Sequence, residues 1–572
     1  MTCGKHMRQC LCRALISAGA ASLLFVIVPV LGIHAAEHDK EYAETGKSIE
    51  LFGHVVRELS EKYVDTVDVG KLIYIGIDGV LESLDPYTVF LDAGQSEELG
   101  EITSGQYAGI GLGLSKFGGA AYVTSVVEGY PAWKAGIRTG DRIMAINGVS
   151  LSKSNIDNLR EMIKGPAGGS LTVKIEREKS GRPPAPETVT LVRQAVHLNT
   201  VSFAGIVDGV AYIVMDSFSA KSAEELSAAL QKLMKESEPE GRSLKGVVLD
   251  LRGNPGGLLT SAIDVAGLFV EKGSEVLSIR GRHPEDRQAY TTQQSPFSST
   301  IPLVVLIDGQ SASASEIVSG AIQDLDRGII IGERSFGKGL VQSIVELPFN
   351  YSIKLTTAKY YTPSGRLIQK DLHSETELIK EGDVPPAGKE KRAKVYYTAK
   401  KRSVYGGGGI LPDISVSAVM LSEYEKALVK DGLIFRFAIS YHSEHAEQPT
   451  LPLDHPSLLL AFDKFLEDQK FSYTSQPEQE FEKLRTLLIK ETPSDGNSEA
   501  SALLGMKEEI VRRKRLELSR NREHIARLLE LEILRHYSET GAKRAGLHDD
   551  PVVRTALELL SDKKRYSGIL SR

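Results

Sequence analysis

The hydrophobic and polar positions divide the chain into regions of different periodicity. After the first residues, apolar side chains recur at spacings of three and four, as at Ile49, Phe52 and Val56, which predicts helix. A stretch punctuated by glycine and rich in strand-like runs follows, then strands alternate with helices, and the last part is helical and highly charged. The predicted regions are a leader at 1–36, a helical segment at 37–100, a strand-rich module at 101–195, an alternating region at 196–415 and a helical extension at 416–572.

Four short, nearly all-apolar runs in the alternating region predict the centre of the fold. They are Val210–Met215, Val247–Leu251, Leu303–Ile307 and Ile329–Ile331. Helical segments separate them, so we expect each run to be a strand that is buried on both faces of a parallel sheet. The sequence therefore predicts an α/β multidomain protein whose core is a sheet covered by helices.

The leader has the pattern of an export signal. Lys5, Arg8 and Arg13 precede an uncharged stretch from Ala14 to Ile33. Small residues follow, and charge begins at Glu37. A basic start, an apolar middle and a small-residue end are typical of a secretory signal peptide. The alternative is a retained membrane anchor, because 20 apolar residues can span a bilayer. In both cases we expect the rest of the chain to be exported, either periplasmic or anchored with its bulk facing the periplasm or the cell exterior.

Composition narrows the classes of protein. Of 572 residues, 41% are hydrophobic and 25% are charged, which is ordinary for soluble globular chains and excludes a disordered or polytopic membrane protein. The net charge of −6 gives no basic field that would attract nucleic acid. All three cysteines, Cys3, Cys10 and Cys12, lie in the leader, so the chain without its leader has no disulfide, thiol nucleophile or thiolate metal ligand.

The strand-rich module contains a candidate peptide site. Closely spaced glycines in SGQYAGIGLGLSKF, residues 104–117, allow backbone N–H groups to point into one concavity that suits a carboxylate. A short helix at 131–136 and the strong hairpin turn Asn147-Gly148 follow. This order of turns and strands resembles a PDZ domain, which captures a free C-terminus by adding the peptide as a strand; the alternative is a small β-module used only for packing. The peptide-binding residues expected from the resemblance are Tyr107, Ala108, Gly109, Ile110, Gly111 and Leu112.

Two segments of the alternating region place small residues where a strand ends and a helix begins. In DLRGNPGGLL a buried strand leads into the Gly253–Gly257 turn, where glycine N–H groups at a helix start form an anion site. In IDGQSASASEIV a strand leads into Ser311, Ser313 and Ser315 before an apolar helix. A serine at such a turn exposes its hydroxyl beside helix N–H groups. From the residues alone, the run favours the interpretation of these serines as helix caps or small packing residues.

The third segment, GERSFGKGLVQ, contains a candidate base. It imitates the start of a phosphate-binding loop, but Gly339 stands where the motif requires Ser or Thr, so we reject nucleotide binding. None of the three segments contains histidine, and a serine needs a base. A lysine can serve as the base if its surroundings lower its pKa by about 3 from the usual value of ~10.4. Gln342, four residues after Lys338 in an expected strand, can then accept a hydrogen bond from the neutral amine.

Together the segments resemble the C-terminal processing peptidases, also called tail-specific proteases. These are exported serine peptidases with a Ser/Lys dyad and a PDZ domain. The landmarks are kept in order between about residues 45 and 415: SGQYAGIG, GDRI, DLRGNPGG, SASASEI, FGKGLVQ and GGGGILPDI. The resemblance implies a ClpP/crotonase-like α/β protease core with an inserted PDZ-like β-rich domain, a helical N-terminal segment and a helical C-terminal extension.

The resemblance also assigns the catalytic roles. It implies that Ser313 is the nucleophile, Lys338 the general base and Gln342 the residue that orients the lysine. It places the oxyanion hole at the N–H of Ala314 and one N–H of the Gly256–Gly257 pair. It requires no metal and no cofactor.

We therefore expect a serine endopeptidase that binds polypeptides with free, apolar C-termini and processes or degrades exported proteins. Residues 416–572 lie outside the motif set, and contacts with an adaptor or a second copy of the chain are expected there. The main alternative is a PDZ scaffold that holds C-termini on a protease-like core without cutting them. A second alternative is an acyl-CoA enzyme on the same core, against which the export signal and the PDZ-like module both argue.

Overall fold

The computed structural model describes residues 44–571 apart from 152–155, 180–184, 238–242, 371–393, 446 and 492–496. The predicted signal peptide or anchor at 1–36 lies outside the described residues. Within the described ranges, no helix has the length and apolar character needed to cross a membrane. The chain divides into two compact units, Met1–Asp92 with Ile344–Leu355 and Ala93–Ser343 with Thr356–Arg572.

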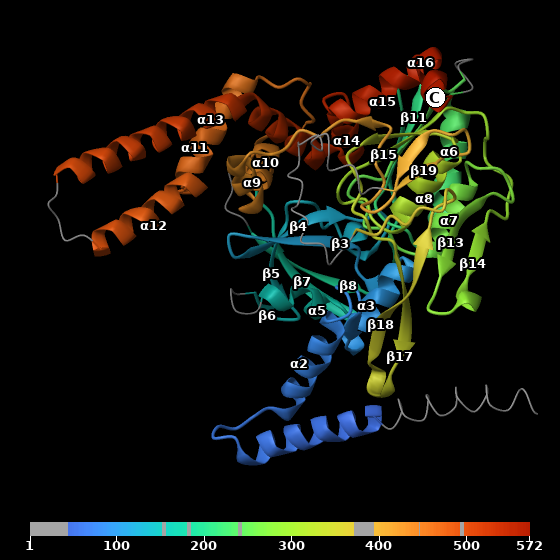
Figure 1. Ribbon diagram of the computed structural model, residues 1–572. Helices are drawn as coiled ribbons and strands as arrows, with labels where there is room; N and C mark the ends of the chain where they lie inside the picture. Colours follow the sequence, from blue (N-terminus) through green and yellow to red (C-terminus); the bar gives the residue numbers. More distant parts are fainter. Residues whose placement is uncertain are drawn as a thin grey trace, which may run out of the picture. The chain divides into compact units, whose positions relative to one another are not determined.

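A six-stranded sheet forms the centre of the larger unit (Figure 1). Its strands, in spatial order, are β10 (Val201–Val207), β11 (Val210–Met215), β12 (Gly246–Asp250), β15 (Leu303–Ile307), β16 (Ile329–Gly332) and β21 (Ile414–Ser415). β10 is antiparallel to β11, and every other neighbouring pair is parallel. All residues of β12, β15 and β16 are buried, which confirms the prediction of central strands covered on both faces.

Helices from distant parts of the sequence cover the two faces of this sheet. Because successive residues of a strand point to opposite sides, Val247 and Leu249 pack into one hydrophobic core while Val248 packs into the other. The first core is completed by α6 (Ser222–Ser237), α7 (Leu259–Gly267) and α8 (Ala314–Asp324). The second is completed by α15 (Pro551–Ser561) and α16 (Lys563–Leu570). The two helices near the C-terminus are therefore a layer of the α/β core.

A second sheet of the larger unit carries the strands that lead into and out of the lysine segment. It contains β13 (Glu275–Arg280), β14 (Gln288–Thr291) and the ends of β17 (Leu340–Glu346) and β18 (Ser352–Tyr361), with η3 (Pro284–Asp286) between β13 and β14. β13 pairs antiparallel with β14 and with residues 359–361 of β18. β17 pairs with β18.

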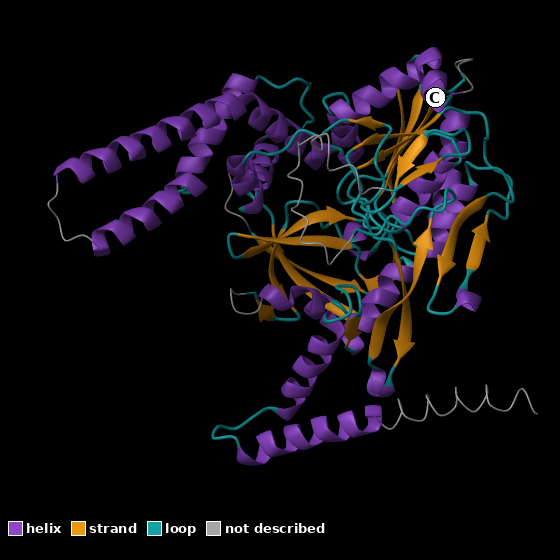
Figure 2. Ribbon diagram, viewed as in Figure 1, coloured by secondary structure: helices purple, strands orange, loops and turns teal. Residues whose placement is uncertain are grey.

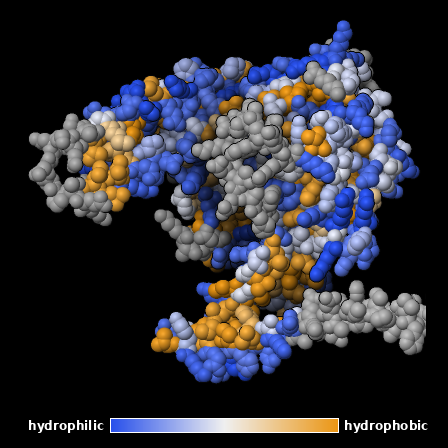
Figure 3. Space-filling view, viewed as in Figure 1, coloured by the Kyte–Doolittle hydropathy of each residue, from blue (hydrophilic) through white to orange (hydrophobic). Residues whose placement is uncertain are grey.

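The smaller unit is mostly helical, as the spacing of its apolar positions predicts. It consists of a helix at 44–62, α2 (Val69–Glu82), β1 (Val89–Leu91), which pairs with residues 352–354 of β18, and η4 (Pro348–Asn350). Asp68 caps α2 by accepting a hydrogen bond from the Lys71 N–H at 3.1 Å. Figure 3 shows apolar side chains gathered over these two helices. Phe52 and Val55 of the first helix are exposed.

The glycine-punctuated module forms a separate β-rich body with its own hydrophobic core. Its main sheet has the order β3-β4-β5-β7-β8, with β6 beside β5 and a separate β2–β9 pair. The bounds are β2 (Gln106–Gly109), β3 (Leu112–Phe117), β4 (Ala120–Val126), β5 (Arg142–Ile146), β6 (Val149–Ser150), β7 (Ser170–Glu176), β8 (Pro186–Val192), β9 (Gln194–His197), α3 (Ala93–Ser104), α4 (Pro131–Lys134), η1 (Ile156–Asn158) and α5 (Leu159–Ile163). Asn147 and Gly148 both have positive φ, 50° and 78°, and form the predicted hairpin turn between β5 and β6. β3 lies at an edge of the sheet.

Helices fill most of the chain beyond residue 416 (Figure 2). They are α9 (Glu423–Lys430), α10 (Leu433–Glu444), α11 (His455–Asp468), α12 (Gln476–Glu491), α13 (Asn497–Tyr537) and α14 (Glu539–Leu547). Phe437, Phe462 and Leu529 belong to a core that α9, α10, α11 and α13 share. This part contacts the PDZ-like module, because the ring of Phe435 lies 5.5 Å from that of Phe117.

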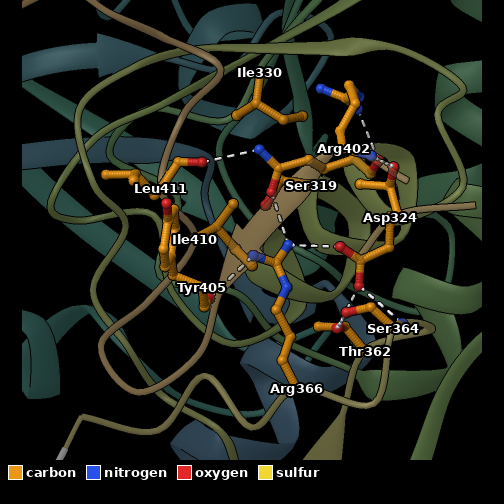
Figure 4. A network of polar contacts seen from close by, with 12 residues as sticks. Ser319, Asp324, Ile330, Thr362, Ser364, Arg366, Arg402, Tyr405, Ile410 and Leu411 are labelled. Atoms are coloured by element: carbon orange, nitrogen blue, oxygen red, sulfur yellow. Dashed lines mark hydrogen bonds and ion pairs between the residues drawn. The ribbon is translucent and has the colours of Figure 1, made fainter. Parts of the chain in front are cut away.

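A buried ionic network holds the end of α8 against the loops that follow β18 (Figure 4). The Arg366 guanidinium is fully buried and donates hydrogen bonds to Asp324 and Gln323, each at 2.7 Å. Arg402 donates to Asp326 at 2.6 Å and also reaches the carboxylate of Asp413. Short strands β19 (Val395–Tyr397) and β20 (Ser403–Tyr405) flank this network. Since buried charges remain ionic only when they are paired, these contacts strongly restrain one end of the helix that begins at the serine segment.

Candidate active site

Ser313 occupies the turn between β15 and α8. It is the residue before the first helical position, with φ 54° and ψ −111°. A positive φ is uncommon for a residue with a side chain and indicates strain of about 1–3 kcal/mol that the surroundings hold in place. Such a strand-to-helix turn presents a serine hydroxyl beside the free N–H groups of the helix. The backbone of Ser313 therefore has the conformation that a nucleophile at a sharp turn requires.

The other two serines of the segment have structural roles. Ser311 and Ser315 are completely buried, whereas Ser313 is only half-buried. The Ser311 hydroxyl donates to the Leu251 carbonyl at 2.8 Å, and the Ser315 hydroxyl donates to the Asn254 carbonyl at 2.9 Å. Both bonds tie the serine turn to the glycine turn that follows β12. The packing interpretation thus holds for these two serines, and Ser313 is the accessible one.

The glycine turn lies directly against the start of α8. A Cβ atom on Gly256 would meet the Ala314 nitrogen and the Ser313 Cβ, each at 2.9 Å, and Gly256 and Gly257 have φ of 100° and 152°. Only glycine fits this close approach. The Gly256 N–H donates to the Asn254 side-chain oxygen at 2.9 Å. Within the described part of the chain, the N–H groups of Gly257 and Ala314 donate no hydrogen bond, so these two remain as candidate oxyanion donors.

Lys338 lies in the loop between β16 and β17 and is half-buried. Its backbone N–H donates to a carboxylate oxygen of Glu316 at 2.9 Å, the same oxygen that accepts the Ser313 N–H at 2.9 Å. The backbones of the predicted nucleophile and the predicted base are therefore adjacent, although they belong to different segments. After Lys338 the chain enters a strand, in agreement with the rejection of a phosphate-binding loop, which would open a helix.

Glu316 is the site residue that sequence reasoning missed. It is fully buried in the first turn of α8, although charged side chains are rarely buried without partners. Its carboxylate accepts four hydrogen bonds, from the Ser335 hydroxyl at 2.5 Å, the Gly337 N–H at 2.7 Å, the Lys338 N–H at 2.9 Å and the Ser313 N–H at 2.9 Å. Burial raises the pKa of Glu316, and these donors oppose that rise by favouring the carboxylate. The sequence feature that could have identified Glu316 is the S-x-x-E spacing of Ser313 and Glu316, which is typical of a capping box.

Gln342 lies on β17 and is half-buried. Its side-chain amide donates to the Thr356 hydroxyl on β18 at 3.4 Å. Lys338 and Gln342 do not lie on one strand as expected, because β17 begins at Leu340, after the lysine. The role of Gln342 in orienting the lysine stays a prediction.

The predicted peptide site lies where β2 ends and β3 begins. Tyr107, Ala108 and Gly109 belong to β2, and Leu112 is the first residue of β3. The side chain of Ile110 is 1% exposed and packs into the core of the module, so this residue offers only its backbone. Gly111, with φ 77°, has no room for a side chain, because a Cβ would lie 2.8 Å from the Cβ of Tyr130.

The hydroxyl of Tyr107 faces the N–H groups of the loop. Burial raises the pKa of this hydroxyl, and the N–H groups of Gly111 and Leu112 oppose the rise. β3 is an edge strand of the sheet, and edge strands are the positions at which PDZ domains add a peptide strand.

Three family models match successive parts of the chain. The family described as "Peptidase family S41" matches residues 209–377, "PDZ domain" matches 122–177, and "Probable PDZ-protease, C-terminal helical domain" matches 424–560. The last of these covers most of the extension that the motifs of the sequence left unassigned. The fold class predicted from the sequence is confirmed.

Two related proteins have names that agree with the family resemblance of the sequence. The carboxy-terminal-processing protease of Bartonella bacilliformis is 35% identical over 394 residues, which are 67% of this chain and 89% of the relative. Carboxy-terminal processing protease CtpB of Bacillus subtilis is 33% identical over 366 residues, 63% of this chain and 72% of the relative.

Two solved structures are also similar in part. The photosystem II D1 C-terminal processing protease is 29% identical, with a TM-score of 0.32, and the match covers 56% of this chain and 90% of that one. The PDZ domain of the carboxy-terminal protease from Vibrio cholerae, solved in complex with peptide, is 28% identical, with a TM-score of 0.15, and the match covers 16% of this chain and 99% of that one.

A helix-covered α/β core, a PDZ domain and a C-terminal helical domain define a multidomain serine-type peptidase. The chain belongs to the carboxy-terminal processing proteases of peptidase family S41. The resemblance found in the sequence is thereby confirmed.

Proposed function

We propose that this peptidase is an endopeptidase that binds polypeptide C-termini through its PDZ domain and cleaves by a Ser313/Lys338 dyad. The observation that carries the proposal is the joint position of the two residues. Ser313 stands at a strained turn beside the N–H groups of Ala314 and Gly257, and its N–H and that of Lys338 share one oxygen of Glu316. The shared carboxylate supports the proposal because it holds the backbones of the two residues side by side, next to candidate oxyanion donors.

The proposed reaction is acyl transfer. Neutral Lys338 accepts the proton of the Ser313 hydroxyl while the oxygen attacks the scissile carbonyl. The N–H groups of Ala314 and Gly257 stabilise the oxyanion of the tetrahedral intermediate. Lys338 then gives the proton to the leaving amine, and water, activated by the same lysine, hydrolyses the acyl-enzyme.

The proposed substrate is a polypeptide with a free, apolar C-terminus. The edge strand β3 and the loop N–H groups at Gly111 and Leu112 support this choice, because an added strand aligns along β3 and its carboxylate reaches the loop. For the place of action we propose the periplasm or the outer face of a membrane, supported by the basic, apolar and small-residue pattern of 1–36. Contacts with an adaptor or a second copy through residues 416–572 belong to the same proposal.

The test is cleavage of a loosely folded protein that ends in an apolar tail. The purified chain is compared with its Ser313→Ala and Lys338→Ala variants, and a serine-reactive phosphonate followed by peptide mass mapping locates the nucleophile. We expect the parent to cut and to be labelled at Ser313, and both variants to lose at least about 10³-fold in kcat. Both variants should keep the tail affinity of the parent.

Two results would reject parts of the proposal. Equal cutting by the parent and Lys338→Ala would remove the lysine from the role of base. Tail binding by all three proteins without any cutting or phosphonate labelling of the parent would favour the scaffold interpretation over the dyad.

A further inference from the structure

Tyr360 is a buried tyrosine that touches both segments of the proposed dyad. It lies near the end of β18, and its side chain is 1% exposed. Its hydroxyl is within hydrogen-bonding distance of the Ser313 carbonyl, at 3.3 Å, and forms a closer bond to the Lys338 carbonyl. Its backbone N–H donates to the Gly339 carbonyl at 3.0 Å, so β18 follows the lysine segment closely.

Tyr360 contacts the backbone carbonyls of Ser313 and Lys338, whereas Glu316 contacts their backbone N–H groups. Glu316 accepts the N–H groups of Ser313 and Lys338, and Tyr360 donates toward their carbonyls. The two segments are thus linked twice, once by a buried carboxylate and once by a buried phenol. A phenol has a single proton to donate, so the shorter contact to Lys338 is the principal bond and the contact to Ser313 is the weaker one.

We propose that Tyr360 is a positioning residue for the peptidase reaction, which sets the position of Lys338 relative to Ser313. The inference rests on the proposed Ser/Lys function. The hydroxyl of Tyr360 bonds to backbone carbonyls, so it acts on the reaction only through the placement of the two residues. A displacement of about 1 Å in a reacting group can cost about 10²-fold in rate, which is why a single buried bond at this place matters.

The test is Tyr360→Phe in the full chain, because this change removes the hydroxyl and keeps the ring. We expect kcat for a tailed protein substrate to fall about 10- to 100-fold with KM unchanged. Labelling of Ser313 by a serine-reactive phosphonate should slow by a similar factor. The pH dependence of kcat should keep its shape, because a misplaced lysine lowers the rate at every pH.

Tyr566→Phe is the matched control. The Tyr566 hydroxyl is also buried and bonds to the backbone of Leu303, donating to its carbonyl and accepting from its N–H, each at 2.9 Å. Tyr566 lies in the hydrophobic core on the opposite face of the central sheet. Both variants should lose thermal stability to a similar extent, and only Tyr360→Phe should lose kcat.

Three outcomes would overturn the positioning role. The first is a kcat of Tyr360→Phe within twofold of the parent, and the second is an equal loss of kcat in Tyr360→Phe and Tyr566→Phe. The third is a pH dependence of kcat for Tyr360→Phe that lacks one limb, because the hydroxyl would then be a proton donor or acceptor. Failure of the proposed function is recognised separately, because the parent would then cut no better than Ser313→Ala.

Discussion

The dyad region and the peptide-binding loop both depend on backbone groups, but the structure holds them in different ways. At the dyad, the N–H groups of Ser313 and Lys338 end on the fully buried carboxylate of Glu316. In the PDZ loop, the N–H groups of Gly111 and Leu112 face the hydroxyl of a half-buried tyrosine beside an edge strand. The partner at the dyad is thus a fully buried carboxylate, and the partner in the loop is the hydroxyl of a half-buried side chain.

This difference follows from the two tasks. A catalytic group must be in place before the transition state forms, because reorganisation during the reaction raises the barrier. A loop that captures a carboxylate must leave its donors accessible, so that the peptide supplies the missing partner. The comparison predicts that changes at the dyad act on kcat and that changes at the loop act on KM.

Among changes outside the dyad itself, the largest effect is expected from Glu316→Gln. The new amide nitrogen cannot accept hydrogen bonds, so it leaves buried donors from the two dyad segments unpaired at about 1–3 kcal/mol each. We expect kcat to fall about 10²- to 10³-fold with little change in KM, measured on a tailed substrate. Glu425→Gln is the matched control, since Glu425 is buried and bonds to Ser422 in the same S-x-x-E spacing within the helical domain. Equal loss of activity in both variants would show a general effect on folding.

The contact between the PDZ domain and the helical domain should weaken in acid. Burial, with help from His442 and Arg535, lowers the pKa of His536 from 6.5 to about 4. Below pH 6.5 the unfolded state takes up a proton that the folded state does not, so stability falls between pH 6.5 and 4 by about 3 kcal/mol in total. Urea unfolding at pH 7 and 4.5, followed by the fluorescence of the single tryptophan, Trp133, measures the loss.

The control for this pH effect is His536→Phe, which keeps a ring against Phe435. Two further groups must be considered. The carboxylate of Glu532 lies 3.8 Å from His536, and burial, with help from Arg177 of the PDZ domain, lowers the pKa of His442. The variant should lose most of the acid-induced destabilisation. A variant with the same pH dependence as the parent would assign the effect to His442.

A smaller effect is expected from Gly111→Ala in the peptide loop. The added methyl group would meet Tyr130, so the loop must shift and its N–H groups move with it. We expect KM for a tailed substrate to rise about tenfold while hydrolysis of a short ester stays unchanged. Gly148→Ala has nearly the same φ, 78° against 77°, but no atom within 4 Å of its Cβ, so it controls for backbone strain alone. Equal changes in the two variants would contradict a specific role of the loop.

The smallest effect is expected from Gln342→Ala. If Gln342 orients the lysine, its loss reduces kcat about three- to tenfold, far less than the loss of Lys338 itself. The measurement is a steady-state assay at several pH values. Ser343→Ala, which removes the neighbouring side chain of β17 and its contact with Thr357, is the control. An unchanged rate for Gln342→Ala would restrict this residue to its bond with Thr356.

Local pattern alone was enough for much of the fold. The buried strands of the core follow from short apolar runs, and the hairpin at Asn147 and Gly148 follows from residues that tolerate positive φ. The glycine turn was expected beside the serine turn, and Gly256 lies against Ser313 and Ala314; the catalytic roles of these residues stay a prediction. The choice of Ser313 among three serines came from family resemblance, because nothing in S-A-S-A-S distinguishes the members by spacing.

The sequence by itself determined the elements and the residue types, because helix and strand periods and turn preferences are local properties of the chain. Only the tertiary structure decided which distant groups meet. It placed Glu316 and Tyr360 between Ser313 and Lys338, used the Gly256 N–H within its own turn, and brought α15 and α16 onto the core sheet. These pairings depend on packing between segments that are far apart in the sequence, and no local period records such contacts.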